Sequence, residues 1–135
     1  MIKKKTVCYW SPFISQVATV KAVYNSALSI NKYSKNRFEA AIIDVFGEWK
    51  NCSINDLDKI KFYRLNYIKK LFAFSSEGFL KSRIKYIIIF FISFFSLKNF
   101  LYKYRPDYLI IHLVTSLPLF LNLIYKFDTQ IILRI

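Results

Sequence analysis

The amino-acid sequence predicts an α/β fold, a Rossmann-like parallel sheet with helices on both faces. Short and nearly continuous apolar runs, typical of strands buried on both faces, alternate with segments whose apolar residues recur every three or four positions. Only 2 glycines and 3 prolines interrupt 135 residues, which favours long regular elements. This alternation is characteristic of parallel strands joined by right-handed crossovers.

The composition predicts one folded domain over residues 1–135. Hydrophobic residues make up 55% of the chain and charged residues 21%, so a sizeable core is expected and disorder is not. The length also fits a single domain, because most domains have about 100–150 residues.

The first three elements follow directly from the apolar pattern. Thr6–Trp10 is an apolar run that reads as a buried strand. Gln16–Tyr33 has apolar residues at spacings of three and four, which predicts an amphipathic helix. Phe38–Phe46 is expected to be a second strand, closed by Gly47.

The middle of the chain contains a short and a long predicted helix around a third strand. Ser53–Asp56 has the pattern of a capping box, so a short helical turn is expected there. Ile60–Leu65 alternates apolar and basic residues and is predicted to be a strand. The long helix begins near Ser76 and ends at Tyr104, because Pro106 disfavours helical geometry in the residue before it.

The last third of the sequence is predicted to form a strand, a helix and a second strand. Asp107–Leu113 is an apolar strand, and Leu117–Phe127 is a helix that tolerates Pro118 in its first turn. Thr129–Ile135 is expected to be the final strand. Since both faces of a parallel sheet need cover and no helix follows this strand, the domain is expected to be incomplete at its carboxyl terminus.

The net charge of +13 admits two explanations. A basic surface attracts nucleic acid, anionic lipid or phosphorylated ligands. A genome rich in A and T would equally supply the many Lys, Ile, Asn, Phe and Tyr residues without selection for binding. The lysines are scattered, and no helix-turn-helix, zinc or RNP-like pattern is present, so nucleic acid is not an expected partner.

The two cysteines and the amino terminus indicate a cytoplasmic protein. Cys8 and Cys52 have no metal-ligand spacing, so no metal site is predicted and a reducing compartment is favoured. The basic start is followed by an apolar stretch that Ser11 and Pro12 interrupt, so no signal peptide is expected.

Ligands of open parallel sheets bind beyond the carboxyl ends of the strands, near the point where strand order reverses. The loop after the first strand leads into a helix amino terminus, which can hold a phosphate. It lacks G-x-G-x-x-G, which argues against a standard dinucleotide site. The residues predicted to line the cleft are Trp10, Ser11, Phe13, Asp44, Glu48, Trp49, Thr115, Ser116 and Arg134.

Several of these residues have a structural alternative. His112, which is the only histidine, is either a catalytic group or a hydrogen-bonded core residue. Asp44 and Glu48 are either acid–base groups or ordinary loop carboxylates. Ser116 is a candidate helix cap, and Trp49 is either a stacking platform or part of the core.

Four segments together resemble the amino-terminal domain of family 4-like bacterial glycosyltransferases, which have the GT-B fold and act in O-antigen and capsular polysaccharide synthesis. The segments are Val7–Phe13, Ile43–Trp49, Arg105–His112 with Thr115–Pro118, and Ile132–Ile135. The strongest match is Pro106-Asp107 followed by an apolar strand that ends in His112. One departure is that Ser11–Ser15 replaces the glycine-rich loop of the family.

The resemblance implies a retaining sugar transfer from a nucleotide-sugar donor to a glycan or lipid-linked glycan acceptor, without a metal or other cofactor. It implies that His112 lies beside the transferred sugar. The family holds its donor mainly through a carboxy-terminal half with paired glutamates, which these 135 residues do not include. On this basis the chain alone is expected to be inactive.

Tyr86–Leu97 is apolar on every side and is flanked by basic residues. This length predicts a helix packed partly on the sheet, with an aromatic face and a basic rim that rest on an anionic membrane surface. The expected location is therefore the cytoplasmic face of the plasma membrane. The residues predicted to face the membrane are Lys81, Arg83, Lys85, Phe90 and Phe94.

Two alternatives to this interpretation remain open. A tilted helix over residues 86–102 would be long enough to span a bilayer if its lysines snorkel. In that case the chain would be a small membrane-associated protein without catalytic function, anchored through residues 86–97.

Overall fold

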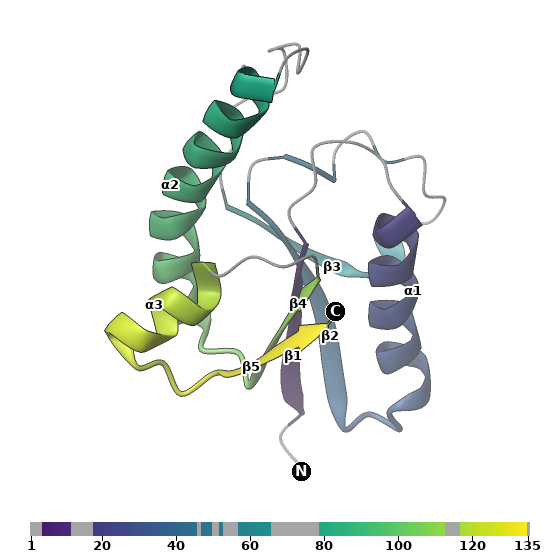
Figure 1. The fold of residues 1–135 in the computed structure, drawn as a ribbon. Coiled ribbons are helices and arrows are strands. Elements are labelled where there is room, and N and C mark those ends of the chain that lie inside the picture. Colours follow the sequence, from purple (N-terminus) through teal and green to yellow (C-terminus); the bar gives the residue numbers. More distant parts are fainter. Residues whose placement is uncertain are drawn as a thin grey trace.

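A five-stranded parallel sheet forms the centre of the protein (Figure 1). The computed structural model describes residues 4–11, 18–45, 47–49, 52, 57–65, 79–112 and 117–134. The strands lie in the order β3-β2-β1-β4-β5, so the order reverses between β1 and β4. Their bounds are β1 Lys5–Trp10, β2 Phe38–Asp44, β3 Lys61–Arg64, β4 Tyr108–His112 and β5 Gln130–Arg134.

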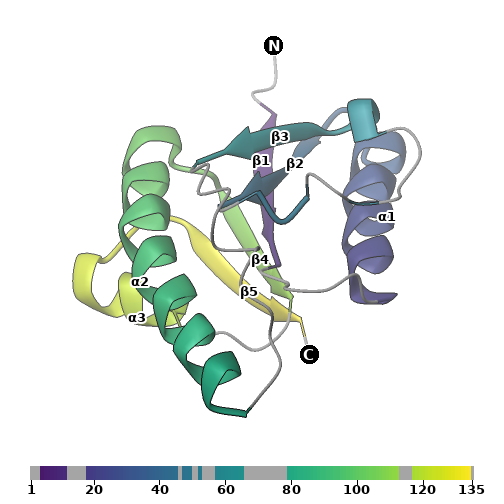
Figure 2. The ribbon, with the colours of Figure 1, turned by 90° about the horizontal axis from the view of Figure 1, so that it is seen from above.

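Helices cover both faces of this sheet. Helix α1 (Ala18–Tyr33) lies on one face, and α2 (Phe79–Tyr104) and α3 (Leu117–Tyr125) lie on the other (Figure 2). A short 3₁₀ helix, η1 (Leu57–Lys59), precedes β3. The predicted Rossmann-like α/β arrangement is thereby confirmed. The predicted capping box at residues 53–56 lies outside the described part of the chain.

Strand β2 ends two residues earlier than the sequence pattern predicted. The carboxylate of Asp44 accepts a hydrogen bond from the amide of Gly47 at 2.7 Å, which turns the chain immediately after the strand. Gly47 has a φ of 86°, a left-handed conformation that glycine adopts without steric cost. The apolar run continues past Asp44, but the strand ends there and Val45 is already part of the turn.

Helices α2 and α3 are each followed by a residue in the left-handed backbone conformation. The amide of Arg105 (φ 42°) donates to the carbonyl of Leu101 at 3.1 Å, and that of Lys126 (φ 47°) donates to Asn122 at 2.8 Å. The side chain of Asn122 also accepts the amide of Phe127 at 3.0 Å. Helix α3 therefore stops before Phe127, where the prediction had placed its end.

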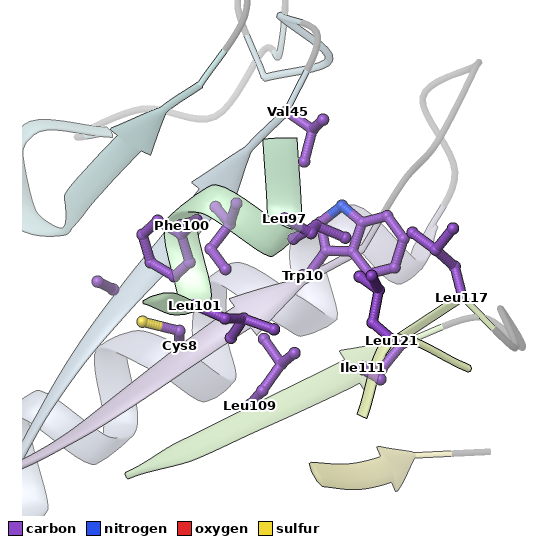
Figure 3. Close-up of a cluster of buried hydrophobic side chains, with 12 residues drawn as sticks. Cys8, Trp10, Val45, Leu97, Phe100, Leu101, Leu109, Ile111, Leu117 and Leu121 are labelled. Carbon is purple, nitrogen blue, oxygen red and sulfur yellow. The ribbon is translucent and has the colours of Figure 1, made fainter. Parts of the chain in front are cut away.

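The core on the α2 and α3 face is built around Trp10. Figure 3 shows its indole between Leu97 of α2 and Leu117 and Leu121 of α3. Below it lies Cys8, where burial raises the thiol pKa to about 12, so the thiol is a neutral packing group at physiological pH. The other buried members of this cluster are Ala41, Ile43, Val45, Phe100, Leu101, Leu109 and Ile111.

The α1 face has a separate apolar cluster and one polar bridge. The cluster joins α1 to the other side of β1 and β2 and consists of Val7, Tyr9, Val20, Val23, Tyr24, Ala27, Ala40, Ile42, Trp49 and Ile60. The carboxamide of Asn31 donates to the carbonyl of Ala40 at 3.2 Å and accepts its amide at 2.7 Å. Ala40 precedes Ala41, the first residue of β2 that β3 pairs. Asn31 thus completes the hydrogen bonding of β2 where its neighbouring strand has not begun.

Asp107, directly before β4, has a structural role. The carboxylate of Asp107 accepts the amide of Thr6 at 2.7 Å, and its carbonyl accepts the amide of Gln130 at 3.0 Å. One residue therefore joins the amino ends of β1, β4 and β5. This contact aligns the three strands whose opposite ends form the candidate site.

Helix α2 packs on the sheet through its carboxy-terminal half. Leu97, Phe100 and Leu101 are buried, whereas Ile87 and Phe91 are exposed. In Figure 1 the amino-terminal half of α2 extends beyond the sheet. Within the described residues, no helix combines the length and apolar character needed to cross a membrane.

Candidate functional site

The carboxyl ends of the strands bring four of the nine predicted cleft residues, together with His112, to one edge of the sheet. Trp10 at the end of β1 pairs in register with Ile43 of β2 and Ile111 of β4. One residue further along lie Ser11, Asp44 and His112, and His112 pairs with Arg134 of β5. The predicted common edge is therefore present, and Ser11 and His112 stand at the point where strand order reverses.

The pleat of the strands divides these residues between the two faces. Trp10 belongs to the core beneath α2 and α3. Tyr9 packs on the α1 side, where its ring lies 6.0 Å from that of His112. The tyrosine hydroxyl and Ser26 of α1 share a hydrogen bond of 2.9 Å, and the guanidinium of Arg134 donates to the same serine at 3.2 Å. The α1 side of the edge thus carries a connected polar cluster.

The electrostatics of this cluster keep His112 neutral. Burial disfavours the charged imidazole, and the nearby Arg134 cation disfavours it further, so the pKa of His112 is lowered. Burial also raises the pKa of the Tyr9 phenol, against smaller opposing effects of its hydrogen bond to Ser26 and of Arg134. At neutral pH the cluster therefore presents an uncharged imidazole and phenol beside one guanidinium.

Because His112 is the only histidine, its titration can be followed without assignment. We expect its NMR midpoint in the folded protein to lie below the ordinary value of 6.5, since burial and Arg134 penalise the charged ring. Below pH 6.5 the unfolded chain binds more protons than the folded one, so stability should fall as the pH is lowered. His112→Gln should flatten this dependence. A midpoint at or above 6.5 would contradict the described environment.

Three buried polar atoms at this edge lack a hydrogen-bond partner within the described structure. They are the indole Nε1 of Trp10, the hydroxyl of Ser11 and Nε2 of His112. Native proteins pair nearly all such atoms, so each unpaired one calls for an explanation. Ser11 follows β1 and His112 is the last residue of β4, so two of these atoms lie on neighbouring strands at the switch point.

Asp44 and Glu48 are engaged in the turn after β2. Asp44 accepts the amide of Gly47, and Glu48 accepts the amide of Val45 at 3.2 Å. Both side chains are buried. Burial of the Cys52 thiol raises its pKa, and the nearby Asp44 and Glu48 carboxylates raise it further. These contacts assign the two carboxylates to shaping the loop. Trp49 packs in the core, with its ring 5.6 Å from that of Phe62.

Sequence reasoning missed Tyr9 and Ser26. Tyr9 lies within a strand predicted to be buried, and Ser26 lies on a predicted amphipathic helix, so neither stood out as polar site residues. The available signal for Tyr9 was its place between Cys8 and Trp10, because successive strand residues point to opposite faces of the sheet. For Ser26 it was a position beside the apolar stripe of α1. Ser26 also lines a mainly apolar groove of about 530 Å³ between α1 and strands β4 and β5, together with Ile30, Tyr33, Tyr108, Ile110 and Ile132.

Some predicted site residues are not covered by the described structure. Phe13, Thr115 and Ser116 lie outside the described residues, as do the side chains of Lys81, Arg83 and Lys85. Of the two phenylalanines predicted to face a membrane, Phe90 is exposed. Phe94 is half-buried and packs beside α3, with its ring 6.4 Å from that of Phe120.

The edge therefore carries a buried serine hydroxyl and a neutral imidazole without partners, with the Arg134 guanidinium on the neighbouring strand. Across the described ranges, no three His, Cys, Asp or Glu residues gather closely enough to hold a metal ion. No protein-family model matches the chain, and no curated protein matches it.

Proposed function

We propose that this domain binds the acceptor in an enzyme that transfers a sugar from a nucleotide-sugar donor to a glycan or lipid-linked glycan. The observation that carries the proposal is the pair of unpartnered buried groups, Ser11 Oγ and His112 Nε2, at the switch point of the sheet. Sugar hydroxyls both donate and accept hydrogen bonds, which matches a serine hydroxyl and a neutral imidazole.

The rest of the edge supports a sugar as the ligand. The Arg134 guanidinium, which donates to Ser26, lies one strand away from His112 and suits the phosphate of a nucleotide sugar or a lipid-linked acceptor. The first loop lacks the glycines of a dinucleotide site, which fits a domain that contacts the acceptor while the nucleotide is held elsewhere. The resemblance of four segments to family 4-like glycosyltransferases points in the same direction.

In this proposal the residues position the acceptor and do not supply acid–base chemistry. His112 is held neutral by burial and by Arg134, so it can exchange a hydrogen bond with a sugar hydroxyl without carrying charge. Ser11 is held at the end of β1 and would fix a second hydroxyl. Asp44 and Glu48 accept backbone hydrogen bonds and shape the neighbouring loop.

The unique His112 resonance provides the test. We expect titration with short glycans and nucleotide sugars to shift the His112 ring signals, because a sugar hydroxyl would pair Nε2. Ser11→Ala should weaken the response about fivefold, the effect of one lost hydrogen bond. Ser29→Ala, at an exposed position of α1, is the matched control and should bind as the parent does.

Two results would count against the proposal. One is the absence of any His112 shift across the sugar panel at millimolar concentrations. The other is equal weakening by Ser11→Ala and Ser29→Ala, which would mean that binding occurs away from the switch point.

A further inference from the structure

Helices α2 and α3 expose a large apolar surface on the side that faces away from the sheet. On α2 the exposed apolar residues at positions 84, 87, 88, 91 and 95 have the spacing of one helix face, and Phe90 is exposed to the side of it. Phe91 and Phe95 are 61% and 62% exposed, and Leu123 of α3 is 76% exposed. We name this surface the outer face; it consists of Ile84, Ile87, Ile88, Phe91, Phe95, Leu119, Phe120, Leu123 and Ile124.

The two helices form one continuous surface. Phe94 lies between them, with its ring 5.3 Å from that of Phe95 and 6.4 Å from that of Phe120. Further along, Tyr102 of α2 contacts Tyr125 of α3 at 6.1 Å. Figures 1 and 2 both show α3 beside α2 on the same side of the sheet. The exposed apolar residues therefore adjoin one another and are not scattered singly.

The burial of α2 shows that the outer face is separate from the core. Leu97, Phe100 and Leu101, on the opposite side of the helix, already provide its contact with the sheet. Soluble proteins seldom expose apolar patches of this extent without a partner. Packing within the described domain therefore does not account for the outer face.

The charges on these helices define the kind of partner. Helices α2 and α3 contain five Lys or Arg residues and no Asp or Glu. The Lys98 amine lies over the ring of Tyr125 at 4.4 Å, and the exposed Lys126 follows directly after α3. The whole chain has 21 basic and 8 acidic residues. Within α2 and α3 the apolar side chains are thus accompanied by positive charge only, while the exposed Asp107 and Asp128 lie three residues beyond the helix ends.

We propose that the outer face docks on the surface of an anionic phospholipid bilayer. Its apolar side chains would enter the headgroup region, and the flanking lysines would contact lipid phosphates, as in helices that lie in the plane of a membrane. The absence of acidic residues from α2 and α3 favours this partner over a protein surface of mixed charge. The inference does not depend on the proposed sugar transfer.

Vesicle binding tests this surface directly. The full chain is expected to sediment with phosphatidylcholine vesicles that contain about 30 mol% phosphatidylglycerol, and to bind pure phosphatidylcholine much more weakly. Raising the salt concentration should weaken binding to the anionic vesicles, because screening reduces the lysine contribution.

Matched substitutions distinguish binding through the outer face from nonspecific adsorption to vesicles. Phe91→Ser and Leu123→Ser should each weaken binding about tenfold, whereas Tyr33→Ser, at a 69% exposed aromatic of α1, should not. Lys98→Gln should weaken binding about fivefold. Lys35→Gln makes the same charge change in the exposed turn after α1, the helix on the opposite face of the sheet, and should have little effect.

Other outcomes would overturn the inference. Equal losses in the outer-face and control variants would show that binding is not located there. A dimer in sedimentation equilibrium that Phe91→Ser dissociates, together with no vesicle binding, would identify a second copy of the chain as the partner. His112 responses to sugars are measured in separate experiments without lipid, so failure of either proposal leaves the other testable.

Discussion

Phe100→Ala is expected to destabilise the domain by about 3–5 kcal/mol, the usual cost of removing a buried phenylalanine from a core. Phe100 is 2% exposed and lies in the cluster that joins α2 to the sheet. Its ring contacts Tyr63 of β3 at 5.0 Å and Tyr104 at 4.9 Å. The truncation would leave a cavity where the helix meets the sheet edge. Urea unfolding followed by circular dichroism measures the loss.

Phe95→Ala is the matched control on the same helix. Its side chain is 62% exposed, so we expect a change in unfolding free energy of within about 0.5 kcal/mol. Similar losses for Phe95→Ala and Phe100→Ala would mean that α2 does not present these two faces as described. The pair therefore tests the orientation on which the outer face depends.

Asn31→Leu is expected to cost about 3 kcal/mol, because it leaves both backbone groups of Ala40 without their partner. Leucine preserves the size of the side chain and favours a helix at least as well as asparagine, so the loss would come from the hydrogen bonds. The amide of Ala40 should also exchange with solvent faster in this variant. Urea unfolding and amide hydrogen exchange provide the two measurements.

Asn25→Leu controls for the same change of residue type on α1. Asn25 is exposed, so this variant should be neutral or slightly stabilising. If Asn31→Leu proved as stable as Asn25→Leu, Asn31 would not be completing the edge of β2. Unchanged exchange at Ala40 would lead to the same conclusion.

The candidate site was predictable only in part. Loops after parallel strands share one edge of a sheet, so the sequence pattern correctly grouped Ser11, Asp44 and His112. Which face each side chain takes depends on where each strand begins and on its register. The cluster of Tyr9, Ser26 and Arg134, three residues far apart in sequence, therefore emerges only when α1 packs on the sheet.

The sequence by itself determined the order and type of the strands and helices, because apolar periodicity is a local property of the chain. Tertiary structure alone decided which side of α2 is buried. Tyr86–Leu97 is apolar on every side of the helix, so its sequence pattern does not indicate which side is buried. The sheet covers only the length of α2 that reaches it, burying Leu97, Phe100 and Leu101 and leaving Ile87 and Phe91 exposed.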